Sequence, residues 1–205
     1  MGAETVSVPN AQLVKQLRER TGAGVLDCQA ALRETRGDLE KAIVYLREKG
    51  ISSAAKKAGR AASDGVIGTY IHPGAKLGVL IEVNCETDFV ARTDDFQQLV
   101  KSLAMQVAAA APPPEYVRRE EIPADRLEQE AAIFRAQVKD KPPQLVEQIV
   151  KGKLDKFCAS ICLLDQPFIK DPAVTVGDVV KQAIAKLGEN ITVRRFTRYQ
   201  LGASG

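Results

Sequence analysis

The sequence predicts an α+β fold in which helices pack on one face of a small antiparallel sheet. Three observations support this prediction. Helical patterns fill residues 8–50, a hairpin with alternating apolar residues follows at 66–84, and further helical patterns precede one last strand-like segment at 191–199. Helices and strands that are segregated along the chain in this way are typical of α+β proteins, whereas alternating βαβ units produce parallel sheets.

The first segment, residues 8–50, is expected to form three short helices around a small core. Their apolar residues recur at helical spacing: Leu13, Val14 and Leu17; Val25, Leu26, Cys28, Ala31 and Leu32; Leu39, Ala42, Ile43 and Leu46. Gly22 and Gly24 interrupt the first pattern, because glycine permits a positive φ. Gly37-Asp38 stops the second helix and caps the third, which we expect to end at Gly50.

A stretch of small and basic residues follows, SSAAKKAGRAAS at 52–63. Its alanine and lysine content favours helix, so we expect a helical linker or a hinge. The predicted domains are therefore a three-helix domain at 1–51, the linker at 52–63 and an α+β core and dimerisation domain at 64–205.

Two strands and a turn are expected next. Residues 66–71 form the first strand, the turn is His72-Pro73-Gly74-Ala75, and residues 77–84 form the second strand. Pro-Gly is a strong turn signal. Leu77, Val79, Ile81 and Val83 alternate, so the face that carries them should be buried. Residues 191–199 are expected to form a third strand.

Four more helices complete the prediction. Their expected spans are 94–110, 123–138, 143 to about 158, and 175–187, and the helix from Asp94 has the clearest apolar stripe. Three prolines at 112–114 end that helix, and Gly188 is expected to be the C-cap of the last one.

Composition limits the classes of function. The chain has 205 residues, 45% of them hydrophobic, and a net charge of +3, which is too small to argue for nucleic-acid binding by itself. Its four cysteines lack Cys-x-x-Cys spacing and it has a single histidine, so we expect free thiols in a reducing compartment rather than a zinc site. The N-terminus has no signal-peptide pattern and no apolar run is long enough to span a bilayer. A trimmed organellar protein would look the same.

No motif points to catalysis. His72 stands without an orienting partner or a nucleophile motif, and no phosphate-binding Gly-x-x-x-x-Gly-Lys-Ser/Thr sequence is present. We therefore expect a binding protein rather than an enzyme, with no metal and no cofactor.

The segment Thr87-Asp88-Phe89-Val90 lies where a strand should turn into a helix. Two interpretations are open. Phe89 could pack into the protein's own core beside Phe96, or it could be an exposed anchor for a pocket in a partner, with Asp88 competing for the partner's cationic or hydroxyl groups. The residues alone do not decide between them.

Two other binding functions are considered. Arg194, Arg195 and Arg198 surround Phe196, a pattern that could stack on RNA, but charges on a protected edge strand explain it better. Residues 8–50 could also act alone as a general helical interaction module.

Two long motifs resemble those of the elongation factor Ts family. LRERTGAGVLDC at 17–28 resembles the family's N-terminal signature, and NCETDFVA at 84–91 resembles its central signature. Shorter matches occur in the same order at 54–59, 163–169, 188–191 and 194–196. The resemblance is collinear over about residues 10–202.

This resemblance implies a guanine-nucleotide exchange factor that recycles elongation factor Tu and makes or breaks no covalent bond. It implies a bundle similar to ubiquitin-associated folds, which docks on the partner's nucleotide-binding domain. The docking residues would be Arg18, Thr21, Gly22, Ala23 and Gly24. It further implies that Thr87 to Val90 bind elongation factor Tu, with Asp88 and Phe89 inserted between helices beside the Mg²⁺ and phosphate site.

Longer family members carry a second insertion, on a hairpin that ends Tyr-x-His-Gly. Tyr70-Ile-His72-Pro-Gly74 looks like a merged version of it. We do not expect one protomer to bring both His72 and Phe89 to the partner, so the resemblance implies a homodimer. Thr197 occupies the place of a cysteine that bridges some compact dimers, so no such disulfide is expected. Neither nucleic acid nor membrane is an expected partner, and the expected location is the cytoplasm or, for a processed chain, the plastid stroma.

Overall fold

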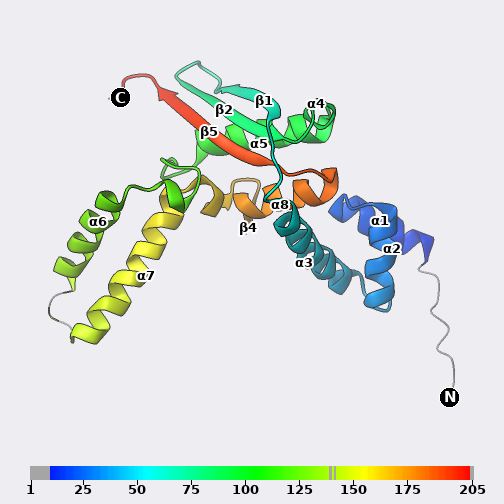
Figure 1. Ribbon diagram of the computed structural model, residues 1–205, viewed down its shortest axis with the longest axis horizontal. Helices are drawn as coiled ribbons and strands as arrows, with labels where there is room; N and C mark the ends of the chain where they lie inside the picture. Colours follow the sequence, from blue (N-terminus) through cyan, green and yellow to red (C-terminus); the bar gives the residue numbers. More distant parts are fainter. Residues whose placement is uncertain (1–9, 139, 141, 204–205) are drawn as a thin grey trace.

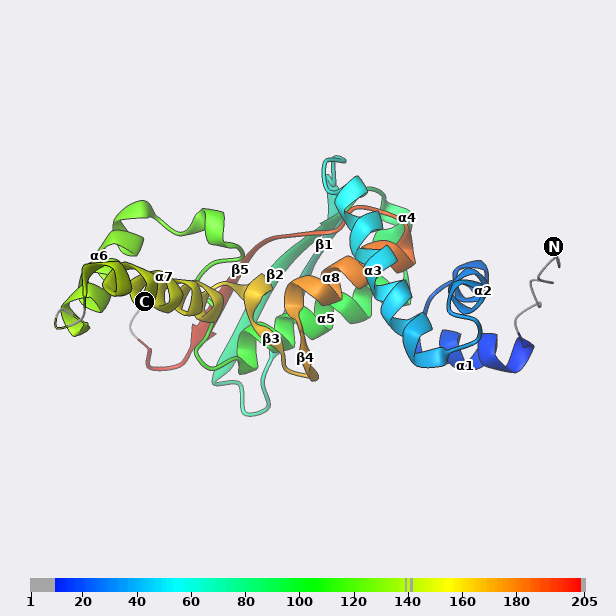
Figure 2. The same ribbon diagram turned by 90° about the horizontal axis from the view of Figure 1, so that it is seen from below.

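The computed structural model describes residues 10–138, 140 and 142–203, and it confirms the predicted α+β class. The N-terminal helices lie at one end, a pair of long helices lies at the other, and a three-stranded sheet lies between them (Figures 1 and 2). The predicted start of the first helix at residue 8, the rest of residues 1–9 and the end of the third predicted domain, residues 204–205, lie outside the described residues.

Three helices form the N-terminal bundle, as predicted: α1 (Ala11–Thr21), α2 (Val25–Glu34) and α3 (Leu39–Lys57). Side chains cap two of them, because Asn10 Oδ1 accepts from Gln12 N and the Asp38 carboxylate accepts from Lys41 N. The buried residues of this bundle are Val14, Leu17, Cys28, Ala31, Leu32 and Ala42. The likeness to ubiquitin-associated folds stays a prediction.

The predicted end of the third helix at Gly50 is wrong, because α3 continues to Lys57. Its second half packs against α8 (Val176–Leu187), and a Cβ at Gly50 would lie 3.4 Å from Ala185 Cβ. Tertiary packing thus overrides the weak helix-breaking tendency of a single glycine. Residues 52–57 of the predicted linker are helical, as their composition indicated, and the chain then leads into the sheet.

The sheet has the order β1 (Asp64–Ile71), β2 (Leu77–Cys85) and β5 (Thr192–Gln200), and both pairs are antiparallel. All three predicted strands are confirmed. Val79, Ile81 and Val83 of the central strand are buried as predicted, and Leu77 is partly buried.

Helix α5 (Asp94–Ala109) covers the inner face of β1 and β2, and α8 packs beside it. At Gly68 a Cβ would lie 2.2 Å from Val100 Cγ1, so only glycine allows α5 to approach β1 this closely. Gly188 adopts a left-handed φ of 82° and forms the predicted C-cap of α8. One large core joins the sheet, α5 and α8.

The remaining helices, α6 (Ala124–Gln137) and α7 (Pro143–Ile161), project away from the sheet as a pair (Figure 1). Phe134 and Phe157 meet edge to face between them. Short 3₁₀ turns, η1 (Arg119–Glu121) and η2 (Leu163–Asp165), connect this pair to the rest of the chain.

A small hairpin and a single helical turn escaped the sequence analysis. Strands β3 (Pro167–Phe168) and β4 (Asp171–Thr175) form a minor hairpin that is too short to show alternation. The predicted turn after β2 is instead a single helical turn, α4 (Asp88–Ala91).

All four cysteines are buried, and none forms a disulfide in the structure. Within the described part of the chain, no helix is long and apolar enough to cross a membrane.

Candidate functional site

The first candidate feature is the wedge turn, defined as residues 87–90, which contains most of α4 between β2 and α5. Thr87 is the N-cap of α4, and its hydroxyl oxygen accepts a hydrogen bond from Val90 N at 3.4 Å. Asp88 occupies the first turn, where a negative charge suits the positive end of a helix. Val90 packs partly buried against the main core. The turn is therefore held by a cap on one side and a core contact on the other.

Phe89 points out of this turn. Its exposed fraction is 79%, whereas Phe96 on α5 is completely buried. The interpretation in which Phe89 packs into the protein's own core beside Phe96 is therefore wrong. A large apolar ring that is held away from the core on an ordered turn is available to fill a pocket in a partner.

Asp88 forms an ion pair with Arg92, with 2.8 Å between Oδ2 and Nη2. Both side chains are more than a third exposed, so the pair contributes little to stability. The Asp88 carboxylate can consequently exchange this contact for a group on a partner at small cost.

The second feature is the docking loop, residues 21–24, together with Arg18. Gly22 adopts a left-handed φ of 67° and closes α1 through a hydrogen bond from its N–H to Arg18 O. The Thr21 hydroxyl donates to Leu17 O at 2.7 Å and accepts from Ala23 N at 3.3 Å. Gly24 is the N-cap of α2, and Arg18, Gly22 and Gly24 are exposed.

Next to this loop the structure exposes side chains that the sequence analysis placed on an apolar helix face. Leu26 is 80% exposed, and Val25 is also exposed. The expected burial of Val25 and Leu26 is wrong, because the first turn of α2 follows Gly24 directly and extends beyond the bundle core. The exposure of Leu26 could have been inferred from its position beside the docking loop, because helical periodicity alone does not show it.

The wedge turn and the docking loop flank the same end of α8. Lys186 Nζ lies 2.6 Å from Asp95 Oδ1 at the start of α5, and a Cβ at Gly22 would lie 3.6 Å from that same nitrogen. In both views α4 lies at the end of the sheet that is nearer to the α1–α2 pair (Figures 1 and 2). The structure therefore places the two predicted binding segments on either side of one end of α8.

His72 lies elsewhere. It is exposed in the β1–β2 turn, and its Nδ1 is 3.1 Å from the Tyr70 hydroxyl. The pairing register sets Asp64 opposite Cys85 at one end of the hairpin and Ile71 opposite Gly78 at the other. At about 3.3 Å per residue, the hairpin separates His72 from the wedge turn by roughly 25 Å.

The outer face of the sheet is apolar and uncovered in the monomer. Its exposed large side chains are Ile67, Ile71, Leu80 and Tyr199, with Leu201 just beyond β5. Most of them line a shallow depression of about 710 Å³. Arg195 Nε donates to Glu82 Oε2 at 2.7 Å beside this patch, so one of the basic residues on edge strand β5 is neutralised within the sheet.

A buried thiol, that of Cys85, lies beside the wedge turn. Cys85 Sγ donates to Thr87 O at 3.2 Å. Burial, followed by the charges of Glu189 and Asp64, raises the pKa of Cys85 to about 11, so this thiol is neutral and unreactive. No group of three or more His, Cys, Asp or Glu side chains in the described ranges is arranged to hold a metal ion.

Comparison with known proteins gives a consistent result. The sequence model of the family described as "Elongation factor TS" matches residues 28–203. A protein from Moorella thermoacetica named "Elongation factor Ts" is 59% identical over 191 residues, which cover 92% of this chain and 93% of the relative. Proteins of the same name from Heliobacterium modesticaldum and Synechococcus elongatus are 56% and 57% identical, cover 94% of this chain, and are themselves covered to 89% and 88%.

Proposed function

The chain belongs to the elongation factor Ts family, and on this premise we propose that it is the guanine-nucleotide exchange factor for elongation factor Tu. In this function it promotes GDP release during translation elongation by binding alone. It is not an enzyme in the covalent sense, and it needs no cofactor of its own.

The observation that carries the proposal is the exposure of Phe89 on a held turn. GDP in a GTPase of this kind is bound by phosphate-loop amides, a lysine and a Mg²⁺ ion that bridges protein and phosphate. We propose that Phe89 and Asp88 insert beside this site and shift the helix that supports it. Each 1.4 kcal/mol of lost binding is about tenfold in affinity, so a few disturbed contacts accelerate release strongly.

Coupling of this kind is reciprocal. If the bound factor weakens nucleotide binding, then nucleotide binding weakens the bound factor by the same ratio. A fresh nucleotide entering the open site therefore drives the factor off, and the cycle needs no chemical step in this chain.

We propose that the docking loop provides affinity for elongation factor Tu, while the wedge turn disturbs its nucleotide-binding site. Arg18, Thr21, Gly22, Ala23 and Gly24, with Leu26 added from the structure, would contact the nucleotide-binding domain of elongation factor Tu. In this division of labour, residues 1–51 form the docking domain, 52–63 the linker, and 64–205 the core that carries the wedge turn.

We further propose that the working form is a homodimer built on the outer sheet face. This is supported by the exposed apolar residues there and by the separation of His72 from the wedge turn. A two-fold axis running across the strands would bring the turn end of one hairpin over the wedge end of the other. The partner's His72 could then complete a surface that one copy leaves incomplete. The place of action is the cytoplasm, as suggested by the bacterial relatives; the plastid alternative stays a prediction.

The function is tested by the release of a fluorescent GDP from elongation factor Tu in stopped flow. Asp88→Ala should slow release at saturating concentrations of the chain by about tenfold, the value of one charge-assisted contact. Asp125→Ala is the matched control, because Asp125 also lies in the first turn of an α-helix but on α6, far from the wedge turn. Wild-type release rates in the Asp88 variant would argue against the proposal.

A further inference from the structure

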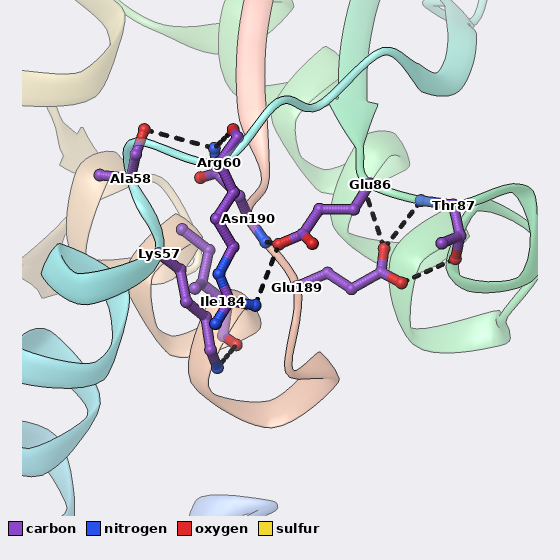
Figure 3. Close-up of polar contacts among 8 residues, drawn as sticks. All are labelled: Lys57, Ala58, Arg60, Glu86, Thr87, Ile184, Glu189 and Asn190. Carbon is purple, nitrogen blue, oxygen red and sulfur yellow. Dashed lines mark hydrogen bonds and ion pairs between the residues drawn. The ribbon is translucent and has the colours of Figure 1, made fainter.

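The Glu189 carboxylate accepts hydrogen bonds from the backbone that leads into the wedge turn (Figure 3). Its Oε2 accepts hydrogen bonds from Glu86 N at 3.1 Å and from Thr87 N at 3.0 Å. Its Oε1 accepts from the Thr87 hydroxyl at 2.7 Å. One carboxylate thus satisfies three donors immediately before Asp88 and Phe89, and hydrogen bonds to an ionised acceptor are stronger than neutral ones.

The neighbouring residue ties the same loop to the linker. Asn190 is 2% exposed, and its backbone N–H donates to Glu86 Oε1 at 2.6 Å. Its side-chain amide donates to Arg60 O at 2.8 Å and to Ala58 O at 3.4 Å. Residues 86–87, 189–190 and the end of the linker therefore form one connected network, shown in Figure 3.

Contacts other than those of the Glu189 side chain cap the two helices beside this network. The C-cap of α8 is made by Gly188, whose N–H donates to Ile184 O. The α4 cap is made by the hydroxyl of Thr87, which accepts from Val90 N. The main effect of the Glu189 side chain is therefore to fix the direction of the segment that carries Phe89.

We infer that Glu189 is a positioning residue for nucleotide exchange, which aims the wedge turn by holding the backbone of Glu86 and Thr87. This inference rests on the proposed function of Phe89. Without Glu189 the exposed ring would sample several directions, so a smaller fraction of docked complexes would hold it in the direction that promotes release, and the saturated rate would fall.

Exchange kinetics give the first test. Glu189→Ala should lower the rate of GDP release from elongation factor Tu at saturation by about tenfold, which corresponds to about 1.4 kcal/mol. The half-saturating concentration should change little, because the docking loop is untouched. Glu189→Gln should restore part of the rate, because its amide oxygen still accepts the backbone N–H groups.

Two comparisons separate positioning from general damage. If Glu189 acts through Phe89, the double variant with Phe89→Ala should release GDP no more slowly than Phe89→Ala alone. Additive losses would overturn the inference. Glu121→Ala is the matched control, because Glu121 also accepts a backbone hydrogen bond, from Val117 N at 3.0 Å, but at η1, away from the wedge turn. It should keep the wild-type rate.

A measurement on the free chain keeps the inference and the proposed function distinguishable. Amide hydrogen exchange at Glu86 and Thr87 should be at least about tenfold faster in Glu189→Ala, while the midpoint of urea unfolding stays near that of the wild type. Unchanged amide protection would overturn the positioning role, even if Phe89→Ala slows GDP release. Conversely, faster amide exchange together with full activity of Phe89→Ala would overturn the proposed function and leave the local role of Glu189 standing.

Discussion

Phe89 and Phe96 lie on consecutive helical elements, yet Phe89 is 79% exposed and Phe96 is completely buried. Both α4 and α5 contact β1 and β2, but Phe89 lies on the exposed side of α4, whereas Phe96 lies on the buried face of α5. Only the ring of Phe96 is buried in the core, so we expect only this ring to contribute to the stability of the chain.

The two rings should differ in their effect on stability. Phe96→Ala removes a buried ring and should lower the free energy of unfolding by about 3–5 kcal/mol. Phe89→Ala should change it by no more than about 0.5 kcal/mol. Urea unfolding followed by circular dichroism measures both, and an equally large loss in the Phe89 variant would mean that its ring packs inside.

Leu26 should contribute to affinity. Because it is 80% exposed beside the docking loop, Leu26→Ala should raise the half-saturating concentration for exchange by about tenfold, the effect of a moderate interface anchor. The maximal rate should stay unchanged. Leu145→Ala, an exposed leucine on α7, is the control. A lowered maximal rate with unchanged half-saturation would contradict the assigned role.

The outer sheet face should determine the oligomeric state. Leu80 lies at its centre, between Thr69 and Thr197 on the neighbouring strands. Leu80→Lys would place two charges in the proposed apolar interface and should produce a monomer in sedimentation equilibrium. Ile133→Lys, on the distant helix α6, should leave the mass unchanged. A wild-type chain that is monomeric at all concentrations would reject the dimer.

High pH should destabilise the chain through its buried thiols. Burial raises the pKa of Cys85 to about 11 and that of Cys162 to about 12, from an ordinary value of 9.0. Above pH 9.0 the unfolded chain loses these protons while the folded chain keeps them, so the free energy of unfolding falls as pH rises toward 11. Urea midpoints at about pH 8 and about pH 10.5 test this. Cys162→Ala should show a smaller fall, and an identical fall would assign the effect to other groups.

The sequence predicts the fold well where one local signal decides. Alternation in residues 77–83 and the glycine at 188 were sufficient for a strand and a cap. Prediction failed where distant packing decides, as at Gly50, which lies inside α3 because α8 packs against it. It also failed for the two-residue strand β3, which is too short to carry a period.

The sequence predicted which residues form the candidate site, but it did not predict the contacts that hold them in place. The wedge turn and the docking loop were recognised from motifs that resemble a family. Their common position beside the end of α8 was not predicted, because it depends on Lys186 and Glu189, which are far from both segments in the chain. Periodicity also misplaced Leu26, since a helical stripe does not reveal which turn of a helix extends beyond its neighbours.

The most direct test of the account is the rate of fluorescent GDP release from elongation factor Tu, measured by stopped flow with the wild-type chain, Phe89→Ala and the control Ile133→Ala. Ile133 is also an exposed apolar side chain, but it lies on α6. The account predicts that Phe89→Ala lowers the saturated rate by at least about tenfold, or about 1.4 kcal/mol, while Ile133→Ala keeps it. Equal rates for all three proteins would contradict the claim that the exposed ring drives nucleotide release.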